Sequence, residues 1–224
     1  MEKFKENLHQ EHPSPNNDIK YDILFPHLDD IEKYNKLQID RKSISLISTC
    51  SQSKIITFII KKHLNNIHIQ YDDVVITDMT AGVGGNAIHF AMNFKYVNAI
   101  EIDKIRSEYL ENNMNVYELQ NLKVYSGDSI NTISDIYHDV LFIDPPWGGT
   151  DYKNKDQIRL SLGTINIEDL INLISSGTIN RCIPKLIVLK LPKNYDIEYF
   201  KKSVIYKNIK FDNMKKITIV TLYL

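Results

Sequence analysis

Short apolar runs alternate with amphipathic stretches from residue 73 onward. The runs that predict strands are VVIT, VNAIEI, LKVYSG, VLFI and KLIVLK, at 74–77, 97–102, 122–127, 140–143 and 185–190. The stretches that predict helices are AIHFAMNF, KIRSEYLENNMNVY and IEDLINLIS, at 87–94, 104–117 and 167–175. This alternation predicts an α/β fold in which helices cover both faces of a mostly parallel sheet.

The end of the chain adds a further strand, KKITIVTLYL, at residues 215–224. No clear helix separates it from the strand at 185–190, so these two segments are expected to form an antiparallel, hairpin-like edge. We expect a Rossmann-like sheet of seven strands, one more than these six segments provide.

The first part of the chain is less regular. Residues 1–20 are polar and show no period, which predicts a flexible arm. Residues 21–65 are expected to form a helical extension, in which SKIITFIIKKHL, residues 53–64, is an amphipathic helix capped by Ser53. Residues 66–224 form the predicted main domain.

Composition narrows the possible partners. The net charge is -1, so any basic surface must be local. Cys50 and Cys182 are isolated, which predicts no metal site. The first residues lack the apolar core of a signal peptide, and no apolar run reaches membrane-spanning length. We expect an intracellular monomer without a membrane partner.

Candidate ligand-binding residues follow the first predicted strand, in TDMTAGVGGNA. The glycines permit a tight turn and a close approach of a ligand to the backbone, although an ordinary glycine-rich connection fits them too. Asp78 can accept hydrogen bonds from an ammonium group. The candidate residues here are Asp78, Thr80, Ala81, Gly82, Gly84 and Asn86.

Acidic residues also end the next two strands. Glu101 can accept from both hydroxyls of a ribose. Asp128, with Ser129 beside it, can accept from an adenine amino group. Asp103 is a further candidate, and Asp103, Asp128 and Ser129 also suit helix caps. Acids at the ends of consecutive strands, beside a glycine turn, predict a nucleoside site.

The glycine order distinguishes two nucleoside cofactors. A dinucleotide site favours GxGxxG around a pyrophosphate, whereas this loop reads GVGGNA. Asp78 just before the loop repels a phosphate and attracts an ammonium. S-adenosylmethionine carries an ammonium, a sulfonium and no phosphate, so the charges favour it as the cofactor.

The fourth strand leads into DPPWGGTDY, residues 144–152. Asp144 can accept a hydrogen from a planar amine, and the prolines stiffen a backbone carbonyl that can accept the other. Trp147 offers a flat face to a base, or it closes the edge of the core. We expect Asp144, Pro145, Pro146 and Trp147 to be catalytic, with Asp144 also near the cofactor.

From about residue 40 the chain resembles the trimethylguanosine synthases, which methylate N2 of a 7-methylguanosine RNA cap. The matching segments are AGVGGNAIHFA, AIEID, GD, DPPWGGTDY and LPKN. The resemblance implies a class I methyltransferase fold, S-adenosylmethionine as cofactor and 7-methylguanosine-capped RNA as partner. It also implies that Trp147 stacks on the cationic base, in agreement with the affinity of Trp for cations.

The resemblance further implies phosphate-binding residues. These are Tyr152, Lys193 with Asn194 in LPKN, and a lysine near the end of the chain, Lys215 or Lys216. Lys193 replaces the usual Arg of the family. The lysines around 215 also fit a solvated basic edge.

Two departures from the family pattern keep other functions open. Asp144 replaces the Ser of many eukaryotic members, which favours an adenine-N6 or other amine methyltransferase as the alternative. Residues 39–55 lack the usual aromatic side chains, so contacts from Ser48 and Thr49 are in question. The third hypothesis is a cap-binding module that has lost its cofactor site.

Overall fold

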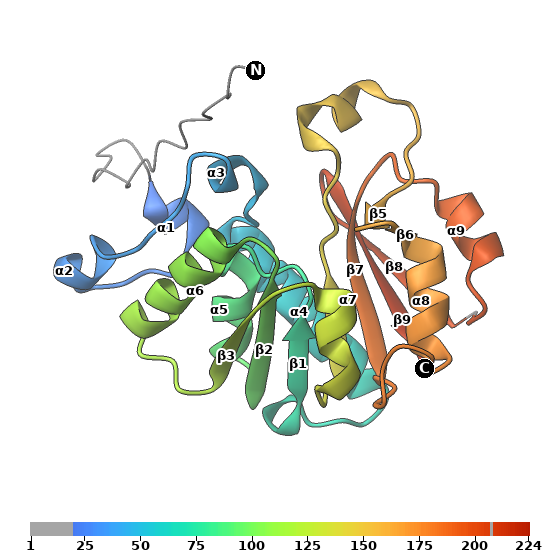
Figure 1. Cartoon of the computed structure of the whole chain (residues 1–224), viewed down its shortest axis with the longest axis horizontal. Helices are drawn as coiled ribbons and strands as arrows, with labels where there is room; N and C mark the ends of the chain where they lie inside the picture. Colours follow the sequence, from blue (N-terminus) through green and yellow to red (C-terminus); the bar gives the residue numbers. More distant parts are fainter. Residues whose placement is uncertain (1–19, 207) are drawn as a thin grey trace, which may run out of the picture.

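A seven-stranded sheet in the order β3-β2-β1-β4-β7-β9-β8 forms the centre of the computed structural model, which describes residues 20–206 and 208–224 (Figure 1). Five neighbouring strands are parallel: β3 (Leu122–Ser126), β2 (Tyr96–Glu101), β1 (Val75–Asp78), β4 (Val140–Ile143) and β7 (Leu186–Pro192). β9 (Ile217–Tyr223) is antiparallel to β7 and to the edge strand β8 (Ile209–Asn213). The predicted Rossmann-like, mostly parallel seven-stranded sheet is confirmed. The arm predicted for residues 1–20 lies, apart from Lys20, outside the described residues.

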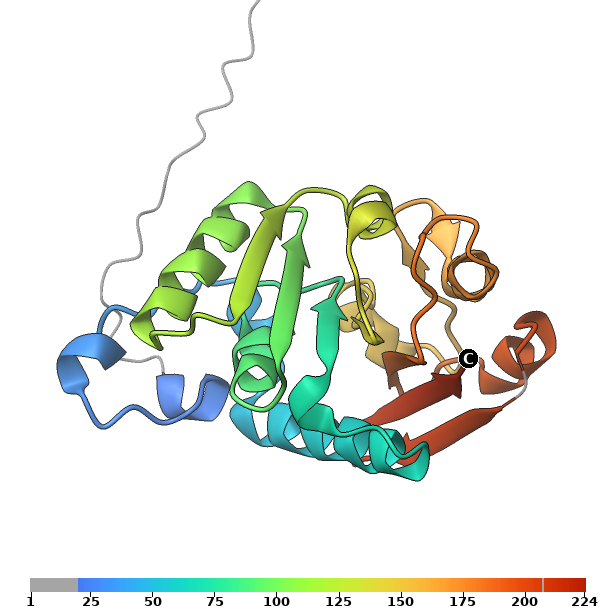
Figure 2. The ribbon, with the colours of Figure 1, turned by 90° about the horizontal axis from the view of Figure 1, so that it is seen from below.

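Helices cover both faces of the sheet, as expected (Figure 2). α4 (Cys50–Asn66), α5 (Gly85–Ala91) and α6 (Lys104–Val116) lie on one face, and α7 (Ser129–Thr132), α8 (Ile167–Ser175) and α9 (Ile197–Ser203) on the other. β4 shows the reason: Val140 and Phe142 enter one core, and Leu141 and Ile143 the other. Successive side chains of a strand point to opposite faces, so a continuous apolar run becomes a strand buried on both sides.

The last strands differ from the sequence prediction. The antiparallel pairing of β7 with the final strand is confirmed, but α9 and β8 lie between them in the chain. α9 has only 7 residues and begins where the Asp196 side chain accepts from Tyr199 N. β8 is a partly exposed edge strand that carries Lys210 and Asp212, so its apolar pattern is weak. Both elements were too short or too polar to give a clear period.

The helix predicted at residues 53–64 starts earlier than expected. α4 begins at Cys50, and its cap is Thr49, not Ser53. Thr49 and Gln52 form a reciprocal capping box, which satisfies two backbone N–H groups at once. Ser53 is therefore a buried residue inside the helix.

The N-terminal segment packs on the sheet domain. α1 (Tyr21–Leu24), α2 (Ile31–Tyr34) and α3 (Ser43–Leu46) precede α4. Leu24, Phe25 and Leu37 share a core with Ile88 of α5 and Val116 of α6. α4 belongs to the core of the sheet itself, and the division at residues 65 and 66 stays a proposal. No helix within residues 20–206 and 208–224 has the length and apolar character to cross a membrane.

Candidate active site

The candidate acids lie at one edge of the sheet, where the parallel strands end. Asp78 is the last residue of β1 and Glu101 the last of β2, while Asp144 directly follows β4. Asp128 follows β3 after a single glycine. Parallel strands end at a common edge, and ligands of open α/β sheets bind there.

The glycine turn after β1 is tied to the end of β2. Gly82 and Gly84 have φ of 54° and 106°, which side chains rarely tolerate. Gly82 N donates to Glu101 Oε2 at 2.7 Å, and Ala81 N donates to Ile100 O at 3.0 Å. A Cβ on Gly84 would lie 2.6 Å from Leu110 Cδ1. Conformation thus favours glycine at both positions, and space favours it at Gly84 as well.

Asp78 is a buried carboxylate with one free oxygen. Its Oδ1 accepts from Thr80 N at 3.0 Å, whereas its buried Oδ2 has no hydrogen-bond partner among the described residues. Burial, together with the nearby carboxylates of Asp144 and Glu101, raises the pKa of Asp78 to about 7. An unpartnered carboxylate oxygen in this position fits a ligand ammonium.

The remaining acids of the nucleoside site have structural roles as well. Glu101 Oε1 accepts from Asp103 N at 2.9 Å, so both oxygens of Glu101 hold backbone amides. Asp103 caps α6, and Asp128 caps α7 through Ile130 N. Ser129 is buried at the start of α7. These caps are observed, and cofactor contacts of the same residues stay proposals.

A segment before α4 covers the glycine turn. Asn86 donates to Ser48 Oγ at 3.0 Å and accepts from Ser53 Oγ at 2.9 Å. A Cβ on Gly85 would lie 2.5 Å from Ile47 Cγ1. Ser48 and Asn86 thus brace each other, and a contact of Asn86 with the cofactor stays a proposal.

The loop after β4 contacts the loop after β1. Asp144 N donates to Thr80 Oγ1 at 2.8 Å. Pro145 is buried, Pro146 is exposed and Trp147 is partly buried. Gly148 and Gly149 then turn the chain with φ of 82° and 76°. This hydrogen bond joins the predicted cofactor loop after β1 to the predicted catalytic loop after β4.

Lys190 belongs to this site and was missed from the sequence. It lies on β7 with 4% of its surface exposed, and its Nζ lies 2.6 Å from Asp144 Oδ2. The same Nζ lies 5.2 Å from the Trp147 ring centroid. Burial raises the pKa of Asp144, and the ion pair with Lys190 opposes that rise. The available signal was a lysine near the end of an otherwise apolar buried strand.

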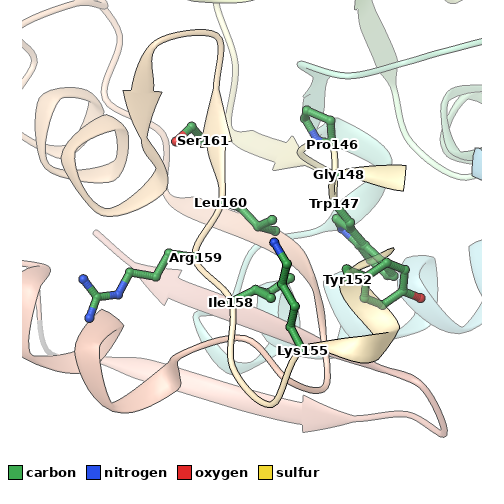
Figure 3. A pocket seen from close by; sticks show the side chains of 9 residues that line it. All are labelled: Pro146, Trp147, Gly148, Tyr152, Lys155, Ile158, Arg159, Leu160 and Ser161. Atoms are coloured by element: carbon green, nitrogen blue, oxygen red, sulfur yellow. The ribbon is translucent and has the colours of Figure 1, made fainter. Parts of the chain in front are cut away.

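A cavity of about 190 Å³ opens beside Trp147 (Figure 3). Trp147 and Tyr152 meet edge to face at 5.1 Å on one side, and Ile158 and Leu160 lie opposite. The Lys155 side chain, also missed from the sequence, points into the cavity, and no hydrogen bond or ion pair of its ammonium is found within the described part of the chain (Figure 3).

Of the predicted phosphate-binding residues, Tyr152 lines this cavity, Asn194 contacts its loop, and Lys193 and Lys215 lie around the end of β7. Asn194 Nδ2 donates to Tyr152 O and to Lys155 O, each at 2.7 Å, and so braces the loop. Lys193 Nζ donates to Asn213 Oδ1 at 2.6 Å, and Lys193 N donates to Lys216 O at 3.3 Å. The end of β7 thus meets the turn that carries Lys215, which is exposed.

Comparison with known proteins identifies related sequences. Residues 73–223 match a family model described as RNA cap guanine-N2 methyltransferase. The uncharacterized protein L320 of Acanthamoeba polyphaga mimivirus is 35% identical over 217 residues, which cover 88% of this chain and 83% of that protein. Trimethylguanosine synthase of Schizosaccharomyces pombe is 32% identical over 133 residues, or 55% of this chain. The match spans 52%, about half, of that synthase.

Solved structures show the same fold. The 16S rRNA N2 G1207 methyltransferase RsmC of T. thermophilus, solved with AdoMet and guanosine, superimposes with a TM-score of 0.55 at 12% sequence identity. The superposition covers 83% of this chain and 43% of that protein. At this identity the likeness establishes the architecture of the sheet and helices.

Proposed function

Because the chain belongs to the RNA cap guanine-N2 methyltransferase family, we propose that it methylates the exocyclic N2 of 7-methylguanosine in RNA caps. The chain is a methyltransferase, and its cofactor is S-adenosylmethionine. The proposal concerns the acceptor, which is the cap base, and the residues that bind it. One or two methyl groups on N2 would give 2,7-dimethyl- or 2,2,7-trimethylguanosine.

The hydrogen bond between Asp144 N and Thr80 Oγ1 is the observation that carries this proposal. It joins the loop expected to hold the target amine to the loop expected to hold the cofactor. Two reactants held at adjoining loops react as if within one molecule, which can remove several kcal/mol from the barrier, roughly 7–11 in the best cases.

Acidic side chains are expected to bind the cofactor. The unpartnered Oδ2 of Asp78 fits the ammonium, and Glu101 lies where it can reach the ribose hydroxyls. Ile102, directly after Glu101, is 73% exposed and offers an apolar surface to a flat adenine beside Asp128. Bound S-adenosylmethionine supplies a methyl carbon that is activated by its positive sulfonium.

Asp144 is expected to orient the acceptor amine. Its Oδ2 is held by Lys190, and the nearby Trp147 indole N–H also stabilises the ionised carboxylate. By accepting one amine hydrogen, Oδ1 aims the nitrogen lone pair at the methyl carbon. Bound S-adenosylmethionine would supply the methyl group for the new N–C bond and keep the electrons of the broken C–S bond on sulfur, and water would take the proton lost by nitrogen.

Charge at the site suits a cationic base. Asp78, Glu101 and Asp144 carry three negative charges when ionised, and Lys190 carries one positive charge. The cofactor adds one net positive charge and 7-methylguanine a second, so the loaded site is neutral. Trp147 then gains a cation–π contact with the methylated base that unmethylated guanine lacks.

The cap phosphates are expected to lie toward Lys155, Lys193 and Lys215. Lys155 points into the cavity beside Trp147, and Lys193 lies at the end of β7, next to the turn that carries Lys215. Tyr152 lines the same cavity and is our proposed hydroxyl contact. A chain of net charge -1 can bind a phosphate chain through such a local cluster.

The test is mass analysis of products formed from 7-methyl-GTP, GTP and an adenine-containing oligonucleotide. We expect only 7-methyl-GTP to gain methyl groups, and Trp147→Ala to abolish the reaction while the fold is kept. Methylation of the oligonucleotide alone would instead establish the adenine-N6 alternative, which Asp144 favours. Cap binding without cofactor binding would indicate the binding module.

A further inference from the structure

A lysine and an aspartate form an ion pair between two central strands at the proposed methyl-transfer site. Ile143, the last residue of β4, is paired in register with Leu189 of β7, so Asp144 directly after β4 comes next to Lys190 of β7. Lys190 Nζ lies 2.6 Å from Asp144 Oδ2. The side chains of Lys190 and Asp144 are only 5% and 15% exposed.

Such a pair is costly to maintain unless both partners are charged. Lys190 is flanked by Leu189 and Leu191, both fully buried, so its ammonium has lost most of its water. Its hydrogen-bond partner in the described residues is Asp144. Removal of either charge would leave the other buried and uncompensated. The strand therefore carries a lysine where an apolar residue would be the simpler choice for stability.

The arrangement leaves Asp144 with one fixed and one available oxygen. Lys190 holds Oδ2, no hydrogen bond to Oδ1 is found in the part of the chain that the structure describes, and the buried Trp147 indole N–H lies close enough to the carboxylate to lower its pKa. An ionised Oδ1 accepts a hydrogen from an amine, whereas a protonated carboxyl can present a donor instead. Asp78, which ends the neighbouring strand β1, and Asp144 disfavour each other's negative charge, and Glu101, which ends β2, acts on Asp78 in the same way. Lys190 is the positive group that offsets them.

We infer that Lys190 is a positioning residue for methyl transfer: it keeps Asp144 ionised and turned so that Oδ1 accepts the target amine. The inference rests on the proposed function for the identity of the amine, but the effect of Lys190 on Asp144 does not depend on it. Lys190 Nζ also lies 5.2 Å from the Trp147 ring centroid, so the Lys190–Asp144 ion pair lies next to the ring that is proposed to stack on the base.

The test compares Lys190→Met with the wild-type chain in two ways. The carboxyl of Asp144 is titrated by carbon NMR in the cofactor-free protein, with its signal assigned through Asp144→Asn. The pH profile of kcat is measured with S-adenosylmethionine and 7-methyl-GTP. We expect the Asp144 titration to move upward by about one pH unit or more, and the acidic limb of kcat to move with it. Below the shifted limb kcat is then lower by roughly tenfold for each unit of the shift and recovers at higher pH, while KM for the cofactor changes little.

Lys185→Met is a matched control. Lys185 forms a 2.7 Å ion pair with Asp139 just before β7 and β4 begin, so it joins the same two strands at their opposite ends. Its loss is expected to lower thermal stability and to leave the pH profile in place. Lys190→Arg, which keeps the charge, is expected to retain a profile close to wild type.

The outcomes separate the two proposals. An Asp144 titration and a pH profile that are unchanged in folded Lys190→Met would overturn the inference. Wild-type Asp144 titrating near neutral pH would do the same, even if Lys190→Met does not fold. Failure of the wild-type chain to methylate 7-methyl-GTP, with the NMR shift present, would reject the proposed acceptor and retain the role of Lys190.

Discussion

The backbone amide of Gly82 donates a 2.7 Å hydrogen bond to Glu101 Oε2 and thereby fixes the glycine turn against the end of β2. Glu101 Oε1 holds Asp103 N at 2.9 Å in the same way. The carboxylate thus organises both loops that are expected to surround the cofactor ribose. Its two oxygens meet only backbone N–H donors within the described residues, which requires an acceptor at both positions.

Glu101→Gln is expected to weaken S-adenosylhomocysteine binding at least about tenfold, because hydrogen bonds to a charged group contribute about 1.5–3 kcal/mol each. The amide NH₂ of Gln would also face a backbone donor. Isothermal titration calorimetry measures the change. Asp30→Asn is the control, since Asp30 caps α2 on the N-terminal extension and Asn caps equally well. Unchanged affinity in Glu101→Gln would contradict the proposed cofactor role.

Asp78 predicts a pH-dependent cofactor affinity. Its pKa of about 7 means that the cofactor-free protein holds a proton there at pH 6 and largely loses it by pH 8. A ligand ammonium binds the ionised carboxylate, so affinity for S-adenosylhomocysteine is expected to rise from pH 6 to pH 8, with proton release at the lower pH. Asp78→Asn is expected to bind weakly at both pH values. A wild-type affinity that is flat across this range would contradict the prediction.

The same group affects the stability of the cofactor-free chain. Because its folded pKa is raised above the ordinary value of 3.8, protonation favours the folded state. This contribution is fully present below about pH 4 and is lost as the pH rises through about 7. Asp78→Asn is therefore expected to reduce the loss of melting temperature between pH 6 and pH 8, which differential scanning fluorimetry can measure.

A substitution at Lys155 tests the proposed binding of the cap phosphates. Lys155→Ala is expected to raise KM for 7-methyl-GTP about fivefold, since an exposed ion pair contributes about 1 kcal/mol or less. KM for the nucleoside 7-methylguanosine, which has no phosphate, is expected to stay the same. Lys36→Ala, on the N-terminal extension, is the control. Equal effects on nucleotide and nucleoside would place Lys155 against the base instead.

The sequence predicted the elements that are apolar throughout or whose apolar residues follow a regular helical spacing. β4 is apolar at every position and fully buried, and α8 has the bounds that its spacing predicts. α9 and β8 were missed because one is a short capped helix and the other is half exposed. The start of α4 was misplaced because the capping box of Thr49 and Gln52 was overlooked in favour of Ser53.

At the site, single-sequence reasoning found the residues that follow strands but not their partners. Asp78, Glu101 and Asp144 were predicted because each lies at the end of an apolar run that reads as a strand. Lys190 was missed because its role depends on the register of β7 against β4, and this register cannot be read from a single sequence. Lys155 was missed because its direction depends on how the loop folds back.

Asn194 distinguishes bracing of the cap loop from direct contact with substrate. Its Nδ2 donates to Tyr152 O and Lys155 O at 2.7 Å each, so Asn194→Ala removes two hydrogen bonds of about 0.5–1.5 kcal/mol apiece. We expect KM for 7-methyl-GTP to rise about tenfold while affinity for S-adenosylhomocysteine is unchanged. Amide hydrogen exchange in residues 149–155 should become faster in the same variant.

Asn172→Ala is the matched control for Asn194→Ala. Asn172 donates to Ser203 O at 3.0 Å and accepts from Ile205 N at 2.8 Å, so it braces the end of α9 in the same way. Its loss is expected to lower the melting temperature and to leave KM unchanged. A rise of KM in Asn194→Ala without faster exchange in residues 149–155 would mean that Asn194 contacts the substrate itself, as the family resemblance implies.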